Sequence, residues 1–194
     1  EISPSVGYLA DETEHDLVCN YEGDLVAEVK RDCTSLEQVM KQPFQIIKAA
    51  NNGKTDADLL KGAEFTAYLE SSLTKKADGN YEFASATPVV IGENGATEMF
   101  TDEKGYACSI ALPYGTYIVR ETTTPHNYTP VDDFTVRITE NNPNQPQTWR
   151  VLLDDEFEAK LKIIKQDDET KKPVLQKNTE FKIYDLDHKK YVEQ

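Results

Sequence analysis

The sequence has few basic residues and no long apolar run. Lys and Arg number 21 against 35 Asp and Glu, which gives the 194-residue chain a formal net charge of −14. Such a charge argues against nucleic acid, whose phosphates demand Lys and Arg clusters, and against anionic lipid. No apolar run approaches a membrane span, and no signal peptide or anchoring tail is visible. We expect a segment that does not insert into a membrane and that was excised from a longer protein.

Cysteine is also scarce, which argues against a disulfide framework. An odd count of three leaves at least one thiol unpaired, and Cys19 and Cys33 are not placed opposite each other about the turn between them. We expect free, partly buried thiols. Because Cys108 alternates with Tyr106 and Ile110, we interpret it as a small core residue rather than a reactive group.

The motifs of metal, phosphate and nucleophile chemistry are missing as well. Acidic clusters lack the alternating ligands and central glycine of a calcium loop, and the glycines form neither a phosphate loop nor a dinucleotide fingerprint. No Ser or Cys lies in a nucleophile motif. The three histidines are scattered rather than paired as in a zinc site: His15, His126 and His188. We therefore expect no metal, no cofactor and no enzymatic turnover of an external substrate.

Turn signals divide the middle of the chain into short strands, and no long amphipathic helix is visible. Pairs such as Asn52-Gly53 and Asp78-Gly79 separate the apolar runs, while 35–42 and 55–62 could form a short turn at most. The expected strands are 43–49, 63–70, 96–101, 106–111, 116–121, 134–140 and 148–154. This pattern predicts an all-β fold, an antiparallel sandwich of immunoglobulin-like or prealbumin-like architecture, without fixing the strand order.

Three ionisable residues end strand-like runs in phase with large apolar neighbours. Lys48 ends FQIIK, Glu121 ends YIVRE and Asp154 ends RVLLD, so each shares a face with apolar residues of its own run. Burial would favour a neutral amine and a protonated acid, which are the nucleophile and the electrophile of amide formation, while a Glu between them can shuttle the proton. On the alternation alone, strand-end charges that turn out to solvent are the simpler interpretation.

The surrounding sequence resembles a known family of domains. LPYGTYIVRETTTPHNYTP (112–130), together with FQIIK (44–48) ahead of GAEFTAYL (62–69), resembles the Cna B-type, or SpaA-like, prealbumin-like domain of Gram-positive surface proteins and pilins. In that family a Gly-Ala-x-Phe strand follows the Lys strand, and a Leu-Pro-x-Gly-x-Tyr turn leads into a Glu-x-x-x-Pro box. The resemblance covers roughly 43–155.

The resemblance implies the roles of the three charged residues. It implies that Lys48 forms an autocatalytic, intramolecular isopeptide bond to Asp154 and that Glu121 is the assisting catalytic residue. The acceptor in the family is often Asn, so Asp154 departs from the commoner pattern, although Asp also serves there. The adjacent Asp155 lies on the opposite face of the run and is the second choice of acceptor.

An internal repeat indicates that the chain continues into a further unit. The stretch 44–69 returns as 161–186, which aligns Lys165 with Lys48. We therefore predict that Lys165 is the crosslinking lysine of a following repeat. This second copy departs from the pattern because Asn178-Thr179 replaces the Gly-Ala pair.

A second internal sequence similarity lies at the start of the chain. Residues 1–8 match the segment that begins with the assisting glutamate, which makes Glu1 its counterpart in a preceding repeat. We predict three tandem units: 1–42 is the end of one Cna B-like repeat, 43–155 is a complete domain, and 156–194 is the beginning of the next repeat.

The resemblance implies a structural stalk domain of an extracellular, cell-wall-anchored adhesin or pilin-like protein, with its anchoring tail outside this segment. The implied partners are neighbouring repeats of the same polypeptide, with host matrix or glycans bound by other domains. Two alternatives are an accessory domain of a secreted enzyme and a module that binds host matrix or glycan through loops 71–88 or 122–133. An exposed aromatic cluster would support the binding module, and Tyr81, Phe83 and Tyr128 are available for it.

Overall fold

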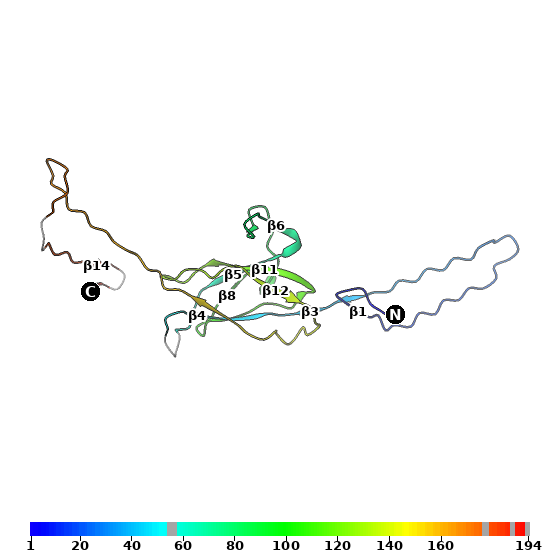
Figure 1. Ribbon diagram of the computed structural model, residues 1–194. Coiled ribbons are helices and arrows are strands. Elements are labelled where there is room, and N and C mark those ends of the chain that lie inside the picture. The colour runs from blue at the N-terminus through cyan, green and yellow to red at the C-terminus, as the bar shows by residue number, and fades with distance from the viewer. Residues whose placement is uncertain (54–57, 176–178, 187–188, 193–194) are drawn as a thin grey trace. The chain divides into compact units, whose positions relative to one another are not determined.

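The computed structural model describes residues 1–53, 58–175, 179–186 and 189–192 (Figure 1). The chain divides into two units, Glu1–Phe157 and Glu158–Gln194. This division lies two residues beyond the predicted boundary at 155, and the first unit includes 1–42. Asn178, His188 and residues 55–57 of the predicted short turn lie outside the described residues.

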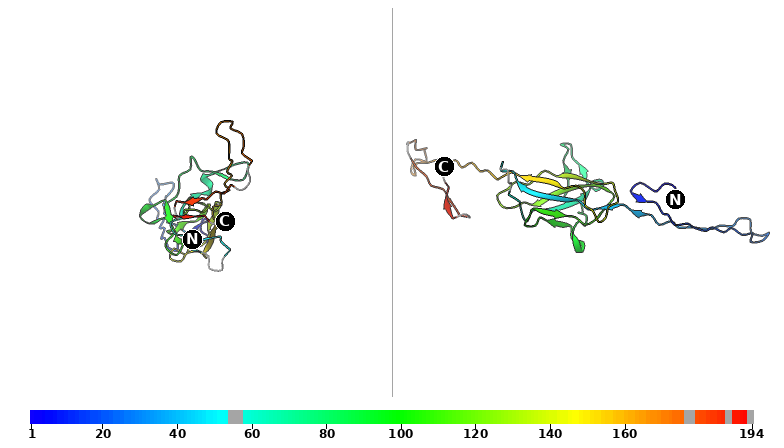
Figure 2. Two further views of the ribbon diagram at one scale, coloured as in Figure 1. Left: turned by 90° about the vertical axis from the view of Figure 1, so that its left-hand side faces the viewer. Right: turned by 90° about the horizontal axis from the view of Figure 1, so that it is seen from below.

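Two sheets form the sandwich of the first unit (Figure 2). One has the order β12-β11-β5-β8, and the other has the order β13-β4-β9. The strands of the first sheet are β5 (Glu64–Leu69), β8 (Glu98–Phe100), β11 (Gly115–Thr123) and β12 (Phe134–Ile138). Those of the second are β4 (Gln45–Ala50), β9 (Tyr106–Cys108) and β13 (Arg150–Asp154). The predicted all-β sandwich is confirmed, and each expected strand has its counterpart.

The pairing within the sheets is antiparallel with one exception. Strands β5, β8, β11 and β12 pair antiparallel, as do β4 and β9. Strand β13, however, runs parallel to β4. The first and last long strands of the sandwich are therefore neighbours that point the same way.

Shorter elements complete the described chain. Two-residue strands pair antiparallel as β1 with β2, β3 with β10, β6 with β7 and β14 with β15. Their bounds are β1 (Tyr8–Leu9), β2 (Gln38–Val39), β3 (Lys41–Gln42), β6 (Thr74–Lys75), β7 (Tyr81–Glu82), β10 (Leu112–Pro113), β14 (Tyr184–Asp185) and β15 (Lys190–Tyr191). Two three-residue 3₁₀ helices are η1 (Glu70–Ser72) and η2 (Glu93–Gly95), and no helix of the described residues is long and apolar enough to cross a membrane.

The core lies between the two sheets. Inward-facing apolar side chains from both sheets pack in one cluster, in which Ile46 of β4 and Phe65 of β5 are fully buried. Burying such side chains stabilises the fold by about 1.5–3 kcal/mol each. The cluster comprises Phe44, Ile46, Ala63, Phe65, Ala67, Ile91, Met99, Ala107, Leu112, Tyr117, Val119, Val136, Ile138 and Leu152.

The predicted core position of Cys108 is wrong. Ala107 lies opposite Ile46 and is buried with it, whereas Cys108 lies opposite Gln45 and is exposed on the outer face of the sheet. A three-residue strand carries too few residues for its alternation to fix the inward phase, and here the partner strand fixes it. The free thiols of Cys19 and Cys33 are exposed rather than partly buried, because their flanking residues contribute nothing to the core cluster.

The core of the described residues draws on neither end of the chain. Its members run from Phe44 to Leu152, and large apolar side chains of the end segments, such as Ile2, Leu25 and Leu175, are almost fully exposed. Backbone that buries little apolar surface opens at low free energy and is readily cleaved.

We therefore expect limited proteolysis to trim both ends and to leave a resistant fragment near 43–155. Mass spectrometry of the surviving fragment checks the boundaries. Equal resistance across the whole chain would mean that the end segments pack onto the sandwich as strands of its own.

Candidate functional site

The structure brings Lys48, Glu121 and Asp154 together inside the sandwich. The Nζ atom of Lys48 donates a hydrogen bond to Oε2 of Glu121 at 2.7 Å and another to Oδ1 of Asp154. All three side chains have no exposed surface. The three residues come from β4, β11 and β13, so one cluster of charge ties both sheets together.

Strand geometry explains how Lys48 and Asp154 meet. On β4, Ile46, Lys48 and Ala50 share the inward face. The parallel register places Leu152 opposite Lys48 and Asp154 opposite Ala50. Asp154 therefore lies one inward position further along the neighbouring strand, within reach of the extended lysine side chain.

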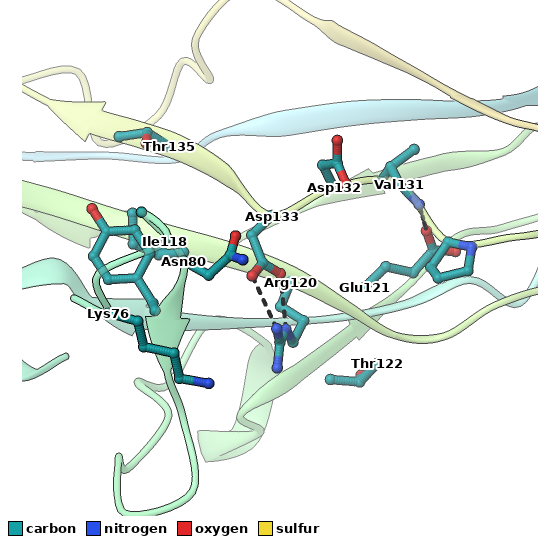
Figure 3. Close-up of a pocket in the computed structure, with 13 residues that line it drawn as sticks. Lys76, Asn80, Ile118, Arg120, Glu121, Thr122, Val131, Asp132, Asp133 and Thr135 are labelled. Atoms are coloured by element: carbon teal, nitrogen blue, oxygen red, sulfur yellow. Dashed lines mark hydrogen bonds and ion pairs between the residues drawn. The ribbon is translucent and has the colours of Figure 1, made fainter. Parts of the chain in front are cut away.

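Glu121 reaches the same place from the other sheet. It lies opposite Phe65 in the β11–β5 register, and the Phe65 ring centroid lies 5.6 Å from the Lys48 Nζ. The backbone N–H of Val131 donates to Oε2 of Glu121 at 3.0 Å, a bond visible in Figure 3. That oxygen therefore accepts from two donors, the lysine and a fixed backbone amide.

Two segments, the turn before β9 and the residues before β5, hold the backbone of Lys48 by hydrogen bonds. Its N–H donates to the carbonyl of Gly105 at 2.7 Å, and its carbonyl accepts from Leu60 N–H at 2.9 Å. Gly105 has a φ of +63°, and a Cβ there would lie 2.2 Å from the Lys48 carbonyl oxygen. Only glycine combines this left-handed conformation with such a close approach.

The electrostatics of the cluster favour one bound proton. Burial raises the pKa of Asp154, the nearby Glu121 and Asp155 carboxylates raise it further, and the hydrogen bond and charge of Lys48 oppose them. Oδ2 of Asp154 and Oε1 of Glu121 are buried without a hydrogen-bond partner among the described residues. Two ionised carboxylates beside one ammonium would leave a net buried negative charge, which is costly to desolvate. Binding one proton makes the cluster neutral.

The two carboxyl groups differ in the hydrogen bonds that they accept. The Oε2 atom of Glu121 accepts from Lys48 and from Val131, whereas the carboxyl group of Asp154 accepts only from Lys48 among the described residues. The lysine amino group thus lies between one carboxyl group held by two donors and another whose pKa is raised by burial.

The other predicted site residues lie outside this cluster. Asp155 is exposed, and its Oδ1 accepts from the side-chain amide of Asn51 at 2.7 Å. Glu1 is exposed and accepts from the N–H of Asp11 at 2.9 Å. Lys165 is exposed as well. The described residues contain no group of three or more His, Cys, Asp or Glu side chains that could hold a metal ion.

A polar groove of about 900 Å³ lies between the β6–β7 hairpin and the segment before β12 (Figure 3). Its cations are already neutralised, because Arg120 makes two hydrogen bonds of 2.8 and 3.0 Å to Asp133 and Lys76 lies 3.1 Å from Glu82. The Phe83 ring, which is not part of the groove lining, lies 3.8 Å from the Arg120 guanidinium carbon. Tyr81, which does line the groove, is half-buried, as are Phe83 and Tyr128, so these described residues do not form the exposed aromatic cluster that would support a binding module.

Several residues of the site were not predicted from the sequence. Gly105 is visible there only as part of a turn, and nothing in the sequence indicates that it contacts the Lys48 carbonyl. Val131 acts through its backbone N–H, which any residue except proline provides. Asn51 was visible only as a residue before a turn, because its contact with Asp155 depends on the parallel strand pair.

Comparisons with known proteins give one family match and several similar solved structures. Residues 43–150 match the family described as SpaA, prealbumin-like fold domain. Among solved structures, the Bacillus anthracis TIE protein is 27% identical with a TM-score of 0.41, over 62% of this chain and 18% of that chain. The minor pilin of Streptococcus agalactiae is 16% identical with a TM-score of 0.47, over 66% and 51%. BcpA, the major pilin subunit of Bacillus cereus, is 22% identical with a TM-score of 0.41, over 63% and 33%.

This chain thus spans between about a fifth and about half of the length of those three proteins. Comparison with curated protein sequences gives no match. The family match covers more than half of the chain and contains the strands that supply Lys48 and Glu121, together with the first residue of the strand that supplies Asp154. The chain belongs to the family of SpaA prealbumin-like fold domains.

Proposed function

We propose that residues 43–155 are a structural stalk domain of a bacterial surface protein and that an amide bond between Lys48 and Asp154 locks the sandwich covalently. One observation carries the proposal: a fully buried lysine amine lies in hydrogen-bond contact with two fully buried carboxyl groups. Without a reaction, such a cluster would contribute little to holding the two sheets together, because removing all three groups from water costs free energy.

The reaction requires only groups already in the cluster. The Lys48 ammonium passes a proton to the Glu121 carboxylate, and the neutral Nζ attacks Cγ of the protonated Asp154. The new C–N bond forms as a C–O bond of the acid breaks, and the oxygen leaves as water with one proton from the acid and one from the amine. Glu121 keeps the remaining proton and is not consumed.

The proposed bond would strengthen the domain in two ways. Lys48 and Asp154 are 106 positions apart, and closing a loop of this size by a covalent bond contributes about 4–5 kcal/mol in the chain-entropy model used for disulfides. Tension that enters through β4 could also leave through β13 by way of the amide, so the residues between them would not have to unfold.

This function implies an extracellular location and a polypeptide partner. A stalk is built from successive domains, so the partners of this unit would be neighbouring repeats of the same polypeptide, and a tail outside this segment would anchor it to the cell wall. Ligand binding by the parent protein would then belong to other domains. The paired cations of the groove agree with this division of roles.

The first prediction of this proposal concerns the mass of the purified chain. Because amide formation releases one water, the intact mass should be one water below the sequence mass of 21.9 kDa. After digestion, the peptides that contain Lys48 and Asp154 should be recovered as one branched species. An unmodified mass, with the two peptides recovered separately, would rule out the crosslink.

The second prediction concerns Glu121. Both Glu121→Gln and Glu121→Ala should fold and form the crosslink far more slowly than the wild type, because neither side chain can take the lysine proton, and Gln retains the volume of the carboxyl group. A general base contributes about 10²–10⁴-fold to a rate, so the loss of water should slow by that order. If either variant reaches the crosslinked mass as fast as the wild type, Glu121 has no role in proton transfer.

The third prediction concerns the pH dependence of an uncrosslinked chain. Lys48→Met removes the nucleophile and keeps an unbranched side chain, while burial and the neighbouring carboxylates still raise the pKa of Asp154 above its ordinary 3.8. A raised pKa means that the folded state binds the proton more tightly. The resulting stability is fully present below about pH 4 and is lost as pH rises through the folded pKa.

Denaturant unfolding at a series of pH values checks this expectation. The matched control is Lys48→Met with Asp154→Asn, which removes the titrating group and keeps its shape. The free energy of unfolding of the single variant should fall with pH relative to that of the double variant. Parallel curves would show that Asp154 does not bind its proton more tightly in the folded state.

A further inference from the structure

The acceptor carboxyl lies at the end of a strand that is paired on one side. Asp154 is the last residue of β13, and β13 is the edge strand of its three-stranded sheet, with β4 as its neighbour among the described strands. The ends of such strands open most easily. Condensation demands that the reacting atoms stay within about 3–3.5 Å in the correct orientation, and a displacement of about 1 Å costs on the order of 10²-fold in rate. The residues just after Asp154 therefore affect the rate of the proposed reaction, because they hold the end of the strand that carries Asp154.

Two segments hold the peptide that follows the acceptor. From the residue that follows β4, the backbone N–H of Asn51 donates to the carbonyl of Asp154 at 2.7 Å, and the Asn51 side-chain amide donates to Oδ1 of Asp155 at 2.7 Å. From the connection between β11 and β12, the N–H of Thr129 donates to the carbonyl of Asp155 at 2.9 Å. The backbone bonds form with almost any sequence, whereas the Asn51–Asp155 contact is specific to these two side chains.

The same connection also holds the proton-accepting carboxylate. Val131, two residues after Thr129, donates its N–H to Oε2 of Glu121 at 3.0 Å (Figure 3). The N–H of Phe157 in turn donates to the carbonyl of Asn127 at 2.7 Å. One short stretch of backbone therefore fixes Glu121 at one end and the exit of the acceptor strand at the other, so a shift of that exit would disturb both groups.

We propose that Asp155 is a positioning residue for the Lys48–Asp154 reaction, and that it acts by accepting the hydrogen bond from Asn51 that holds the end of β13 against β4. This role rests on the proposed function. Asp155 is exposed and lies on the opposite face of the chain from Asp154, so it does not replace Asp154 as the acceptor. Instead it keeps the acceptor in place.

The test follows the loss of water in the full chain as it is made. Cell-free synthesis is stopped at one time point, and intact mass is then sampled to give the rate of crosslinking. Asp155→Ala and Asn51→Ala should each slow the reaction by about fivefold to tenfold, because each removes one solvent-exposed hydrogen bond of ordinary net strength. The double variant should be no slower than the single ones, since both remove the same contact.

Two matched variants separate the hydrogen bond from charge. Asp155→Asn loses the charge and keeps an oxygen that accepts from Asn51, so it should react at the wild-type rate. Glu158→Ala removes an exposed acidic group three residues further on and should also have no effect. Wild-type rates for Asp155→Ala would overturn the proposal, and so would an Asp155→Asn variant as slow as Asp155→Ala, because charge would then carry the effect.

Hydrogen exchange tests the positioning role without reference to the reaction. In the uncrosslinked Glu121→Gln chain, adding Asp155→Ala should speed exchange of the Asn51 amide, which donates to Asp154, and adding Asp155→Asn should not. Unchanged protection would overturn the proposal. A wild-type chain that never loses water, combined with faster exchange in Asp155→Ala, would refute the crosslink and leave the strand contact standing.

Discussion

A lysine ammonium can be stable among apolar side chains only where opposite charge reaches it within hydrogen-bond distance. Here two carboxyl groups, one from each sheet, lie in hydrogen-bond contact with the Lys48 Nζ, and this contact connects the two sheets of the sandwich. The parallel pairing of β13 with β4 brings Asp154 alongside, and the fixed N–H of Val131 holds Glu121 across the core. Because the three groups cannot all be charged without a net buried charge, the site favours a bound proton.

Much of this cluster was predictable because strand alternation is a strict physical rule. Large apolar residues two positions before Lys48, Glu121 and Asp154 indicate the inward face in each run, and the structure places all three side chains there. The alternation does not say that three distant runs meet, since that depends on strand order. The prediction that they meet came from the family resemblance, whose fold the match to residues 43–150 confirms.

What the sequence could not predict depends on neighbouring strands. The phase of β9 is set by its partner β4, so Cys108 faces outward although its alternation with Tyr106 and Ile110 favoured the core. The parallel β4–β13 pair has no local signal, and without it the contact of Asn51 with Asp155 cannot be derived from spacing. Gly105 shows the same limit, because its need for glycine arises from the backbone of another strand.

The direction of β13 has a mechanical consequence. In an antiparallel hairpin pulled at its two free ends, the hydrogen bonds are loaded one after another and the pair unzips. Strands β4 and β13 run parallel, so a pull on the chain before β4 and after β13 acts at opposite ends of the pair and loads its hydrogen bonds together in shear. Lys48 and Asp154 lie toward the β13 exit of this pair, so the contact between their side chains resists the same shear as the hydrogen bonds between the two strands.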